Sequence, residues 1–193
     1  MTKMDRRDAV KKLLDMRDGA LVVTGLGSPS YDVHAAGDRD DNYYLWGAMG
    51  AAALVGLGLA QAQPNKRVMV ITGDGEQLMA FGALATIVVA APKNLDVIVL
   101  DNQHFGETGM QQSHTGKGIA LDRVAQATGF AETAELSTLD EVDALCERLR
   151  LPAVGPRLFV LKIKAENLPR SLPPRDATFI KNRFRAHLGL ETC

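Results

Sequence analysis

The stretch RVMVITGDGEQLMAFGALATIVVAAPKNLDVIVLDN, residues 67–102, decides the fold. It holds two short runs rich in Val, Ile and Leu, Arg67–Thr72 and Leu95–Leu100, with a helical pattern at Leu78–Ala90 between them. Short apolar runs of this kind are typical of strands buried on both faces, and a helix between two such strands connects them in parallel. The stretch therefore predicts a strand–helix–strand unit of an α/β domain.

The same alternation continues on both sides of this unit. We expect an α/β fold in three layers, a parallel sheet with helices on both faces, over residues 1–165. A basic, Pro-rich tail over residues 166–193 follows and ends in a helix at Asp176–Leu188. Residues 30–42 are expected to form a loop. The other predicted elements are helices at Asp5–Arg17, Leu45–Ala60, Leu121–Thr128 and Leu139–Leu149, and strands at Ala20–Thr24 and Arg157–Ile163.

Composition excludes several classes of protein. The chain has 193 residues, 22 Lys and Arg against 23 Asp and Glu, and a formal net charge of −1. That length fits one domain, and the balanced charge argues against binding to nucleic acid or to a membrane surface. Two cysteines, Cys146 and Cys193, are too few for a disulfide framework, so we expect a cytoplasmic protein. The uncharged run Leu45–Ala60 is too short to span a membrane, and Met1–Asp8 lacks the apolar stretch of a signal peptide.

The sharpest chemical feature is Gly73-Asp74-Gly75, where a predicted strand meets a helix. The two glycines permit close approach of a ligand, and free N–H groups at a helix start attract an anion. An anion alone does not need a carboxylate beside it. A carboxylate is expected there when Mg²⁺ bridges Asp74 and a phosphate, because Mg²⁺ prefers carboxylate, amide and phosphate oxygens.

A second oxygen donor is expected at the neighbouring strand end. Asn102 stands there, one helix and one strand after Asp74. The carboxyl ends of adjacent parallel strands meet at one edge of a sheet, so the two side chains should lie close together. A backbone carbonyl at about His104 could supply a third ligand. The sequence thus predicts a metal site formed by Asp74, Asn102 and His104.

This pattern, GDG followed by a helix, a strand and an asparagine, resembles the cofactor motif of the thiamine-diphosphate-dependent enzymes. The family usually has two asparagines where this chain has Asp101-Asn102. Gly47-Ala48-Met49-Gly50, expected at the start of the Leu45–Ala60 helix, is similar to a second family element. Gly25–Ser30 stands where the family's first cofactor-contacting loop lies.

The resemblance implies thiamine diphosphate and Mg²⁺ as cofactors. It implies that Met49 wedges between the two rings of the cofactor, with the backbone of Gly47 and Met49 along the aminopyrimidine edge. Glu76 departs from the small residues common after GDG, so we expect its side chain to turn away from the phosphates and its N–H to bind them. The cofactor-binding residues implied are Gly25, Ser28, Gly47, Ala48, Met49, Gly73, Asp74, Gly75, Glu76, Asn102, His104 and Phe105.

The resemblance implies that these 193 residues hold only the pyrophosphate-binding half of such an enzyme. In the family, a glutamate of a separate pyrimidine-binding domain activates the cofactor. The resemblance therefore implies a partner subunit and a hetero-oligomer. The order of motifs looks most like 2-oxo acid decarboxylases of the sulfopyruvate or phosphonopyruvate type, which implies a small 2-oxo acid as substrate. His104 and His114, in the loop after Asn102, are candidates for proton transfer.

Two alternatives stay open. The first keeps the cofactor but changes the reaction, to carboligation or to 2-oxo acid oxidation, although the cysteine set of an iron–sulfur cluster is missing from the sequence. The second is a nucleotide-binding α/β module without catalysis. The chain lacks the P-loop pattern G-x-x-x-x-G-K-[ST], which disfavours this second alternative.

Overall fold

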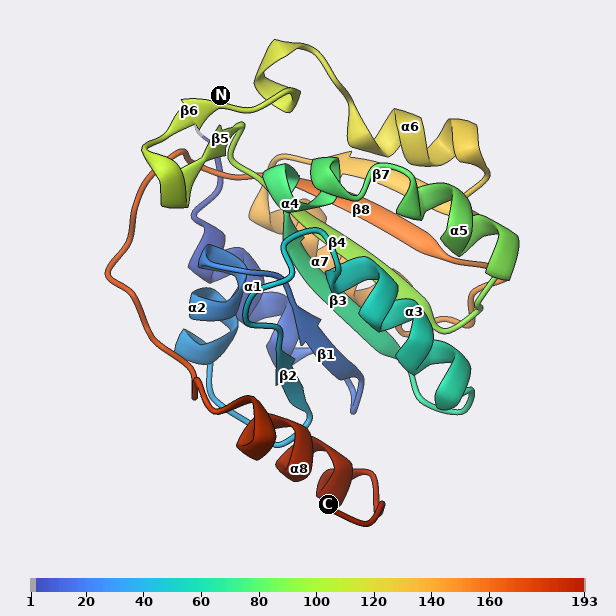
Figure 1. Ribbon diagram of the computed structural model, residues 1–193. Helices are drawn as coiled ribbons and strands as arrows, with labels where there is room; N and C mark the ends of the chain where they lie inside the picture. Colours follow the sequence, from blue (N-terminus) through green and yellow to red (C-terminus); the bar gives the residue numbers. More distant parts are fainter. Residues whose placement is uncertain (1–2, 193) are drawn as a thin grey trace.

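A computed structural model describes residues 3–192 of the chain. The expectations that fall on Met1 and Cys193 lie outside these residues. The main sheet has six parallel strands in the order β2-β1-β3-β4-β8-β7 (Figure 1). The strands are β1 Leu21–Thr24, β2 Asn42–Tyr44, β3 Val68–Gly73, β4 Leu95–Asp101, β7 Glu132–Leu136 and β8 Arg157–Lys162. A separate antiparallel pair joins β5 His104–Phe105 and β6 Gln111–Gln112.

Helices cover both faces of the main sheet, as expected, and the strands alternate between two cores. In β3, for example, Met69 and Ile71 face one core, whereas Val68 and Val70 face the other. This alternation buries the β-branched strands completely, which explains their continuous apolar runs. The helices are α1 Arg6–Asp15, α2 Ser28–Ala35, α3 Ala52–Ala62, α4 Asp74–Met79, α5 Ala83–Ala90, α6 Leu121–Thr128, α7 Leu139–Leu149 and α8 Ala177–His187, with 3₁₀ turns η1 Gly106–Thr108 and η2 Thr115–Lys117.

The helix predicted over Leu45–Ala60 begins later, at Ala52. Gly47, Ala48 and Gly50 have φ angles of 75°, 49° and 97°, which a right-handed helix cannot contain. Residues 45–51 therefore form an irregular turn ahead of α3. The helix is also not buried on every side, because Leu54 is 41% exposed. The prediction of its start and of its full burial was wrong.

Two other segments differ from expectation. Residues 28–35, part of the predicted loop, form α2, in which Pro29 occupies the first turn, where its missing N–H leaves no hydrogen bond unmade. The single helix predicted at Leu78–Ala90 is two helices, α4 and α5, with a break at residues 80–82. The edge strands β2 and β7 were not predicted, because both are short and polar.

The C-terminal segment returns along the outside of α2 and ends against the β2 edge of the sheet (Figure 1). Trp46 donates its indole N–H to the carbonyl of Pro174 at 2.7 Å. Phe184 of α8 packs edge-on against Tyr43 of β2, with ring centroids 5.5 Å apart. In α8, Arg183 also pairs with Asp38 and lies 3.4 Å from the carbonyl oxygen of Asn42. α8 thereby covers the open side of β2.

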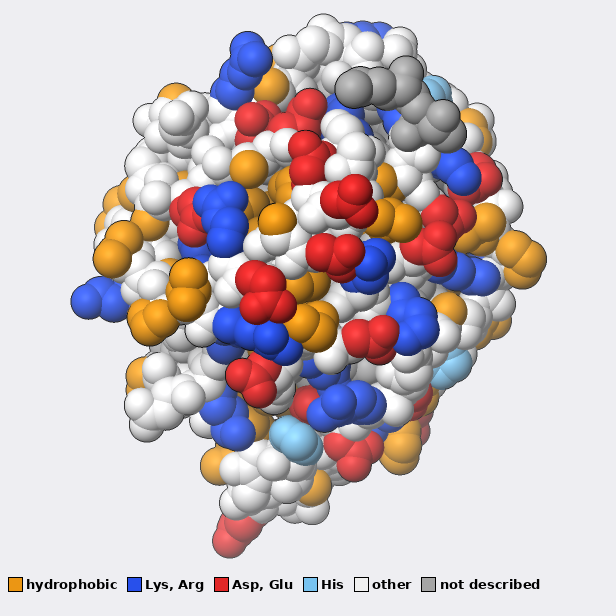
Figure 2. Space-filling model, turned by 180° about the vertical axis from the view of Figure 1, so that it is seen from behind, with side chains coloured by type: hydrophobic (Ala, Val, Ile, Leu, Met, Phe, Trp, Pro, Cys, Tyr) orange, Lys and Arg blue, Asp and Glu red, His pale blue; other side chains and the backbone are white. Residues whose placement is uncertain are grey.

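Positive and negative side chains alternate on the rear face of the molecule (Figure 2). Several of them are paired along or between α1 and α7, as in Lys12 with Asp143 at 2.7 Å and Lys11 with Asp15 at 2.6 Å. Within residues 3–192, no helix is long and apolar enough to cross a membrane.

A capping box begins α7 and gives a test of the fold. Thr138 accepts the N–H of Glu141, and the Glu141 carboxylate accepts the N–H groups of Ser137 and Thr138. These hydrogen bonds to the charged form hold the pKa of Glu141 below its usual value of 4.5. Because the carboxyl pKa is lower in the folded state, the ionised Glu141 side chain stabilises the fold above about pH 4.5. This stabilisation is lost as the pH falls through the folded-state pKa.

We expect Glu141→Ala to lower the free energy of unfolding by about 0.5–1 kcal/mol at pH 7, the range of a side-chain cap. The difference from wild type should be smaller at pH 3 than at pH 7, because the carboxyl becomes protonated as the pH falls. Urea unfolding at the two pH values measures it. Glu147→Ala, in the last turn of the same helix, is the control. An equal loss at both pH values would contradict an ionised cap.

Candidate cofactor site

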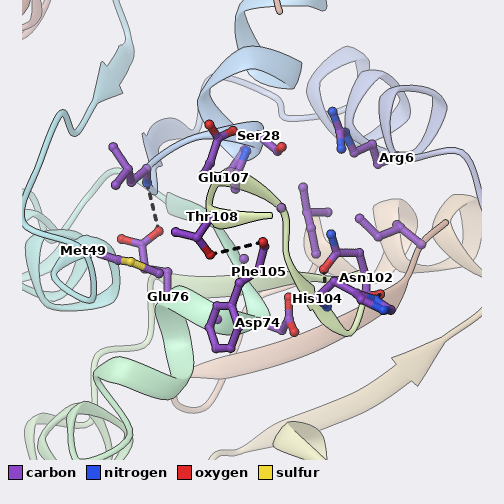
Figure 3. Close-up of a pocket in the computed structure, with 17 residues that line it drawn as sticks. Arg6, Ser28, Met49, Asp74, Glu76, Asn102, His104, Phe105, Glu107 and Thr108 are labelled. Carbon is purple, nitrogen blue, oxygen red and sulfur yellow. Dashed lines mark hydrogen bonds between the residues drawn. The ribbon is translucent and has the colours of Figure 1, made fainter. Parts of the chain in front are cut away.

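The candidate site lies at the carboxyl edge of the sheet, where the strand order reverses between β1 and β3. The chain after β1 runs to one side and the chain after β3 to the other, which leaves a crevice between the two connections. A pocket of about 160 Å³ lies there (Figure 3). Of the predicted residues, the pocket wall contains Ser28, Met49, Gly73, Asp74, Gly75, Glu76, Asn102, His104 and Phe105.

Asp74 follows β3 and is 2% exposed. Its Oδ2 atom accepts a hydrogen bond from the hydroxyl of Ser113. The hydroxyl of Thr115 lies 3.0 Å from the same atom and shares its one proton between Asp74 and Asp101. Burial raises the pKa of Asp74, whereas the Ser113 hydroxyl opposes the shift. The two hydroxyl groups therefore fix the orientation of the carboxylate at the pocket wall. Sequence reasoning did not identify Ser113 or Thr115, which reach Asp74 from an irregular loop.

Asn102 follows β4, the neighbour of β3 in the sheet. Its side-chain oxygen accepts the backbone N–H of His104 at 2.8 Å, and its backbone oxygen lies 2.9 Å from Nδ1 of His104. A carbonyl oxygen can only accept a hydrogen bond, so Nδ1 carries the proton and Nε2 is the unprotonated nitrogen of the neutral ring. Gln103 between them has a φ of 67°, which closes the turn. Asn102 and His104 are thus held together beside Asp74.

Asp101 stands where a second asparagine is usual, and the structure explains how a buried carboxylate is tolerated there. Lys162 is its partner in the register of β4 and β8, with Nζ 2.5 Å from Oδ2. The other oxygen of Asp101 accepts hydrogen bonds from Thr115 at 2.7 Å and from the N–H of Gln103 at 2.9 Å. Lys162 is therefore the charge partner of Asp101.

The site carries few of the residue types that bind transition metals. Among residues 3–192, no group of three or more His, Cys, Asp and Glu side chains is placed to hold an ion. Asp74 and Asn102 offer a carboxylate and an amide oxygen at neighbouring strand ends. Two other carboxylates in the pocket wall already have partners: Glu76 accepts from Leu26, Thr72 and Gly50, and Glu107 is paired with Arg170. Oxygen donors of this kind suit Mg²⁺, which is bound through one or two carboxylates together with phosphate oxygens. The residues present therefore fit a magnesium diphosphate group.

Met49 lines the pocket from the turn at residues 45–51 and is 39% exposed (Figure 3). Gly47 and Ala48 of the same turn are not in the pocket wall, although their left-handed backbone sets the path of the turn. Phe105 packs so closely over Gly75 that a Cβ atom there would lie 2.6 Å from its ring. Glycine is required at position 75 for this close approach.

The two candidate histidines are not brought together. His104 is half-buried in the pocket wall, whereas His114 is exposed and lines a separate hollow with Leu78, Phe81 and Ile119. Gly25 also lies outside the pocket wall, behind the side chain of Glu76. The structure therefore places His104 in the pocket wall and His114 outside it.

Comparison with known proteins identifies this architecture. Residues 30–156 match the family described as thiamine pyrophosphate enzyme, C-terminal TPP binding domain. Sulfopyruvate decarboxylase subunit beta from Methanococcus maripaludis is 34% identical over 185 residues, which cover 94% of this chain and 96% of that protein. The subunit beta from Methanocaldococcus jannaschii is 38% identical over 72% of this chain and 73% of its own length.

Other relatives are longer than this chain. Phosphonopyruvate decarboxylase from Streptomyces viridochromogenes is 38% identical over 92% of this chain, which covers only 45% of that protein. A solved structure from Mycobacterium smegmatis, described as a candidate thiamin diphosphate-dependent enzyme, has the same fold, with a TM-score of 0.70 at 20% identity over 83% of this chain and 32% of its own. The predicted fold is thereby confirmed, and the chain belongs to the thiamine pyrophosphate enzyme family, in which it matches the C-terminal cofactor-binding domain.

Proposed function

We propose that the chain is the pyrophosphate-binding subunit of a thiamine-diphosphate- and Mg²⁺-dependent 2-oxo acid decarboxylase. The substrate is of the sulfopyruvate or phosphonopyruvate type, and a pyrimidine-binding subunit completes the active site. The observation that carries this proposal is the meeting of Asp74 and Asn102 at one pocket wall. Support comes from relatives named as beta subunits of sulfopyruvate decarboxylase, one of which aligns along 94% of this chain.

Four residues of the pocket have a stated role in this proposal. Asp74, the side-chain oxygen of Asn102 and the carbonyl of His104 would hold Mg²⁺. Met49 supports the ring end of the cofactor. When bound, thiamine diphosphate supplies the electron sink that lets CO₂ leave a 2-oxo acid. The protein orients that group and excludes water around it.

His104 is suited to hold or deliver a proton. Its Nδ1–H donates to the carbonyl of Asn102 at 2.9 Å, so the ring is fixed in one tautomer and Nε2 can accept a proton. The carboxyl group that activates the cofactor is assigned to the partner subunit.

The pocket opens beside an apolar surface that suits a partner. Met49, Met79, Phe81 and Ile119 are between 39% and 63% exposed. We call these four residues the apolar face. Met79 lies next to the turn at Gly50, and Phe81 and Ile119 share one hollow, so the face is continuous with the site. Aromatic and Met side chains are enriched at the cores of protein interfaces. We place the pyrimidine-binding subunit on this face.

A double substitution, Met79→Ser with Phe81→Ser, should weaken assembly with the partner at least about tenfold, because interface aromatic residues commonly contribute more than 1 kcal/mol each. Sedimentation velocity of the mixed subunits measures this change. Val154→Ser is the matched control, since Val154 is 85% exposed but precedes β8, at the opposite end of the sheet. Equal assembly by the double variant and the control would move the interface elsewhere.

Calorimetry tests the proposed function directly. Thiamine diphosphate with Mg²⁺ is titrated into this chain alone and into its mixture with the product of the adjacent reading frame. Binding that appears or tightens in the mixture, followed by CO₂ release from 2-oxo acids, is the expected result. Absence of binding in both samples would rule out the cofactor assignment and favour a non-catalytic α/β module.

A further inference from the structure

Glu76 is a buried carboxylate that the proposed chemistry does not use directly. It follows Gly75 in α4 and is 3% exposed. Its Oε2 atom accepts the backbone N–H of Leu26 at 3.0 Å and the hydroxyl of Thr72 at 3.0 Å. Its Oε1 atom accepts the backbone N–H of Gly50 at 3.3 Å. One side chain therefore joins the end of β3 to two other segments.

These two segments form different walls of the pocket. Leu26 lines the pocket from the loop after β1, and Gly50 belongs to the turn that carries Met49, which also lines it. Leu26 and Gly50 lie 24 residues apart in the sequence. The loop belongs to the connection between β1 and β2, and the turn belongs to the connection between β2 and β3. Both N–H groups point at the same carboxylate, so the position of each wall depends on the other through Glu76.

Gly25 is adapted to this arrangement. A Cβ atom at position 25 would lie 1.7 Å from Oε2 of Glu76 and 2.7 Å from its Cδ, whereas the next contact, Oγ1 of Thr72, is at 3.0 Å. Gly25 is not among the residues with positive φ, so its backbone could accept a side chain. The space that a side chain would need is occupied by the carboxylate, which makes glycine necessary at position 25.

We propose that Glu76 is a positioning residue that couples the Leu26 loop to the Met49 turn and so sets the width of the cofactor pocket. The inference rests on the proposed function, because the pocket is taken to hold thiamine diphosphate. An acceptor is required at position 76 because the donors it serves are backbone N–H groups, which cannot be turned away without moving the loops. Glu76 acts through these loops and does not need to touch the cofactor.

The first experiment measures the coupling without any cofactor. Amide hydrogen exchange, followed by NMR, is compared for wild type, Glu76→Ala and Glu76→Gln. We expect the amides of Leu26 and Gly50 to exchange at least about tenfold faster in Glu76→Ala, and Glu76→Gln, which keeps one acceptor oxygen, to lie between. Glu147→Gln, at an exposed position on α7, is the control. Unchanged exchange at both amides in Glu76→Ala would overturn the proposal.

The second experiment separates positioning from simple filling of space. Gly25→Ala alone should weaken binding of thiamine diphosphate and Mg²⁺ to the mixed subunits about tenfold or more and lower the melting temperature. In the Glu76→Ala background, the new methyl group enters the space left by the carboxylate. There Gly25→Ala should raise the melting temperature towards wild type, while cofactor affinity and the protection of Leu26 and Gly50 stay low.

The outcomes are distinct. A double variant that regains cofactor affinity together with its melting temperature would mean that the carboxylate only fills space, which overturns the proposal. An equal loss of melting temperature on Gly25→Ala in the wild-type and the Glu76→Ala backgrounds would also overturn the proposal. If the wild-type mixture does not bind the cofactor at all, the proposed function fails. Amide exchange and the melting temperatures of the four chains then still decide whether Glu76 couples the two loops.

Discussion

Replacement of Asp74 by alanine is expected to abolish Mg²⁺-dependent binding of thiamine diphosphate, with a loss of affinity of roughly 100-fold or more. Asp74 lines the pocket at the end of β3 beside Asn102, whereas Asp101 is paired with Lys162. Removal of a residue that only orients a metal ligand already lowers metal affinity roughly 10–100-fold, so loss of the ligand itself should exceed that range. Calorimetry with the assembled subunits measures the effect.

Two further variants show whether the loss concerns the ligand or the fold. Asp74→Asn keeps the size of the side chain and a carbonyl oxygen that can accept from Ser113 and Thr115, so it should fold like wild type and still bind Mg²⁺ weakly. Thr115→Ala removes one of the hydrogen bonds that orient Asp74 and should give an intermediate loss. Wild-type affinity in a folded Asp74→Ala chain would remove Asp74 from the metal site.

Two glycines of α3 should give opposite changes in stability when each is replaced by alanine. At Gly56, a Cβ atom would lie 2.2 Å from Cγ2 of Val70 and 3.3 Å from Cδ1 of Leu95. Val70 is completely buried in β3 and β-branched, so it cannot turn aside. We expect Gly56→Ala to lower the free energy of unfolding by about 1–3 kcal/mol, the range for overpacking a core.

At Gly58, a Cβ atom would meet nothing within 4 Å, and the residue is exposed. Alanine there should raise the free energy of unfolding by about 0.5–1 kcal/mol, because glycine weakens the interior of a helix. For a domain of this size, 1 kcal/mol corresponds to a change in melting temperature of about 2–4 °C. Calorimetric melting should therefore move down for Gly56→Ala and up for Gly58→Ala. Equal shifts would contradict the close packing of α3 on the sheet.

The central part of the fold could be predicted from the sequence because its strands are buried on both faces. Continuous apolar runs identified β1, β3, β4 and β8. The edge strands could not be found in this way. β2 is the triplet Asn42–Tyr44, and β7 reads ETAEL with its first four residues partly or fully exposed. Their pairing depends on the neighbouring strand, which local sequence patterns do not report.

The predictions of helix boundaries were wrong where backbone geometry outweighs residue type. Ala48 adopts a left-handed conformation that nothing in its side chain indicates. Because of this conformation, α3 begins later in the sequence than predicted. α2 was taken for a loop because Ser28, Pro29 and Ser30 are typical of turns, yet the same residues suit the first turn of a helix. In both cases the tertiary contacts of the segment, rather than its composition, decide its structure.

The predicted metal ligands follow from topology, since the ends of adjacent parallel strands must meet. The residues that orient these ligands could not be predicted from the topology. Ser113 and Thr115 reach Asp74 from a loop whose path no periodicity describes. Lys162 is partly an exception, because a lysine at the end of a buried strand beside Asp101 could have been paired with it once the order of β4 and β8 was known.

The two edges of the sheet have a consequence for how the chain behaves in solution. An open parallel sheet offers unpaired backbone groups at its edges, on which a second copy could add a strand. On one side α8 covers β2. On the other side β7 carries Glu132, which pairs with Arg148, and Glu135, which is 45% exposed. Charged side chains on an edge strand disfavour pairing with the edge of a second copy. Both edges of the sheet are thereby protected against edge-to-edge pairing.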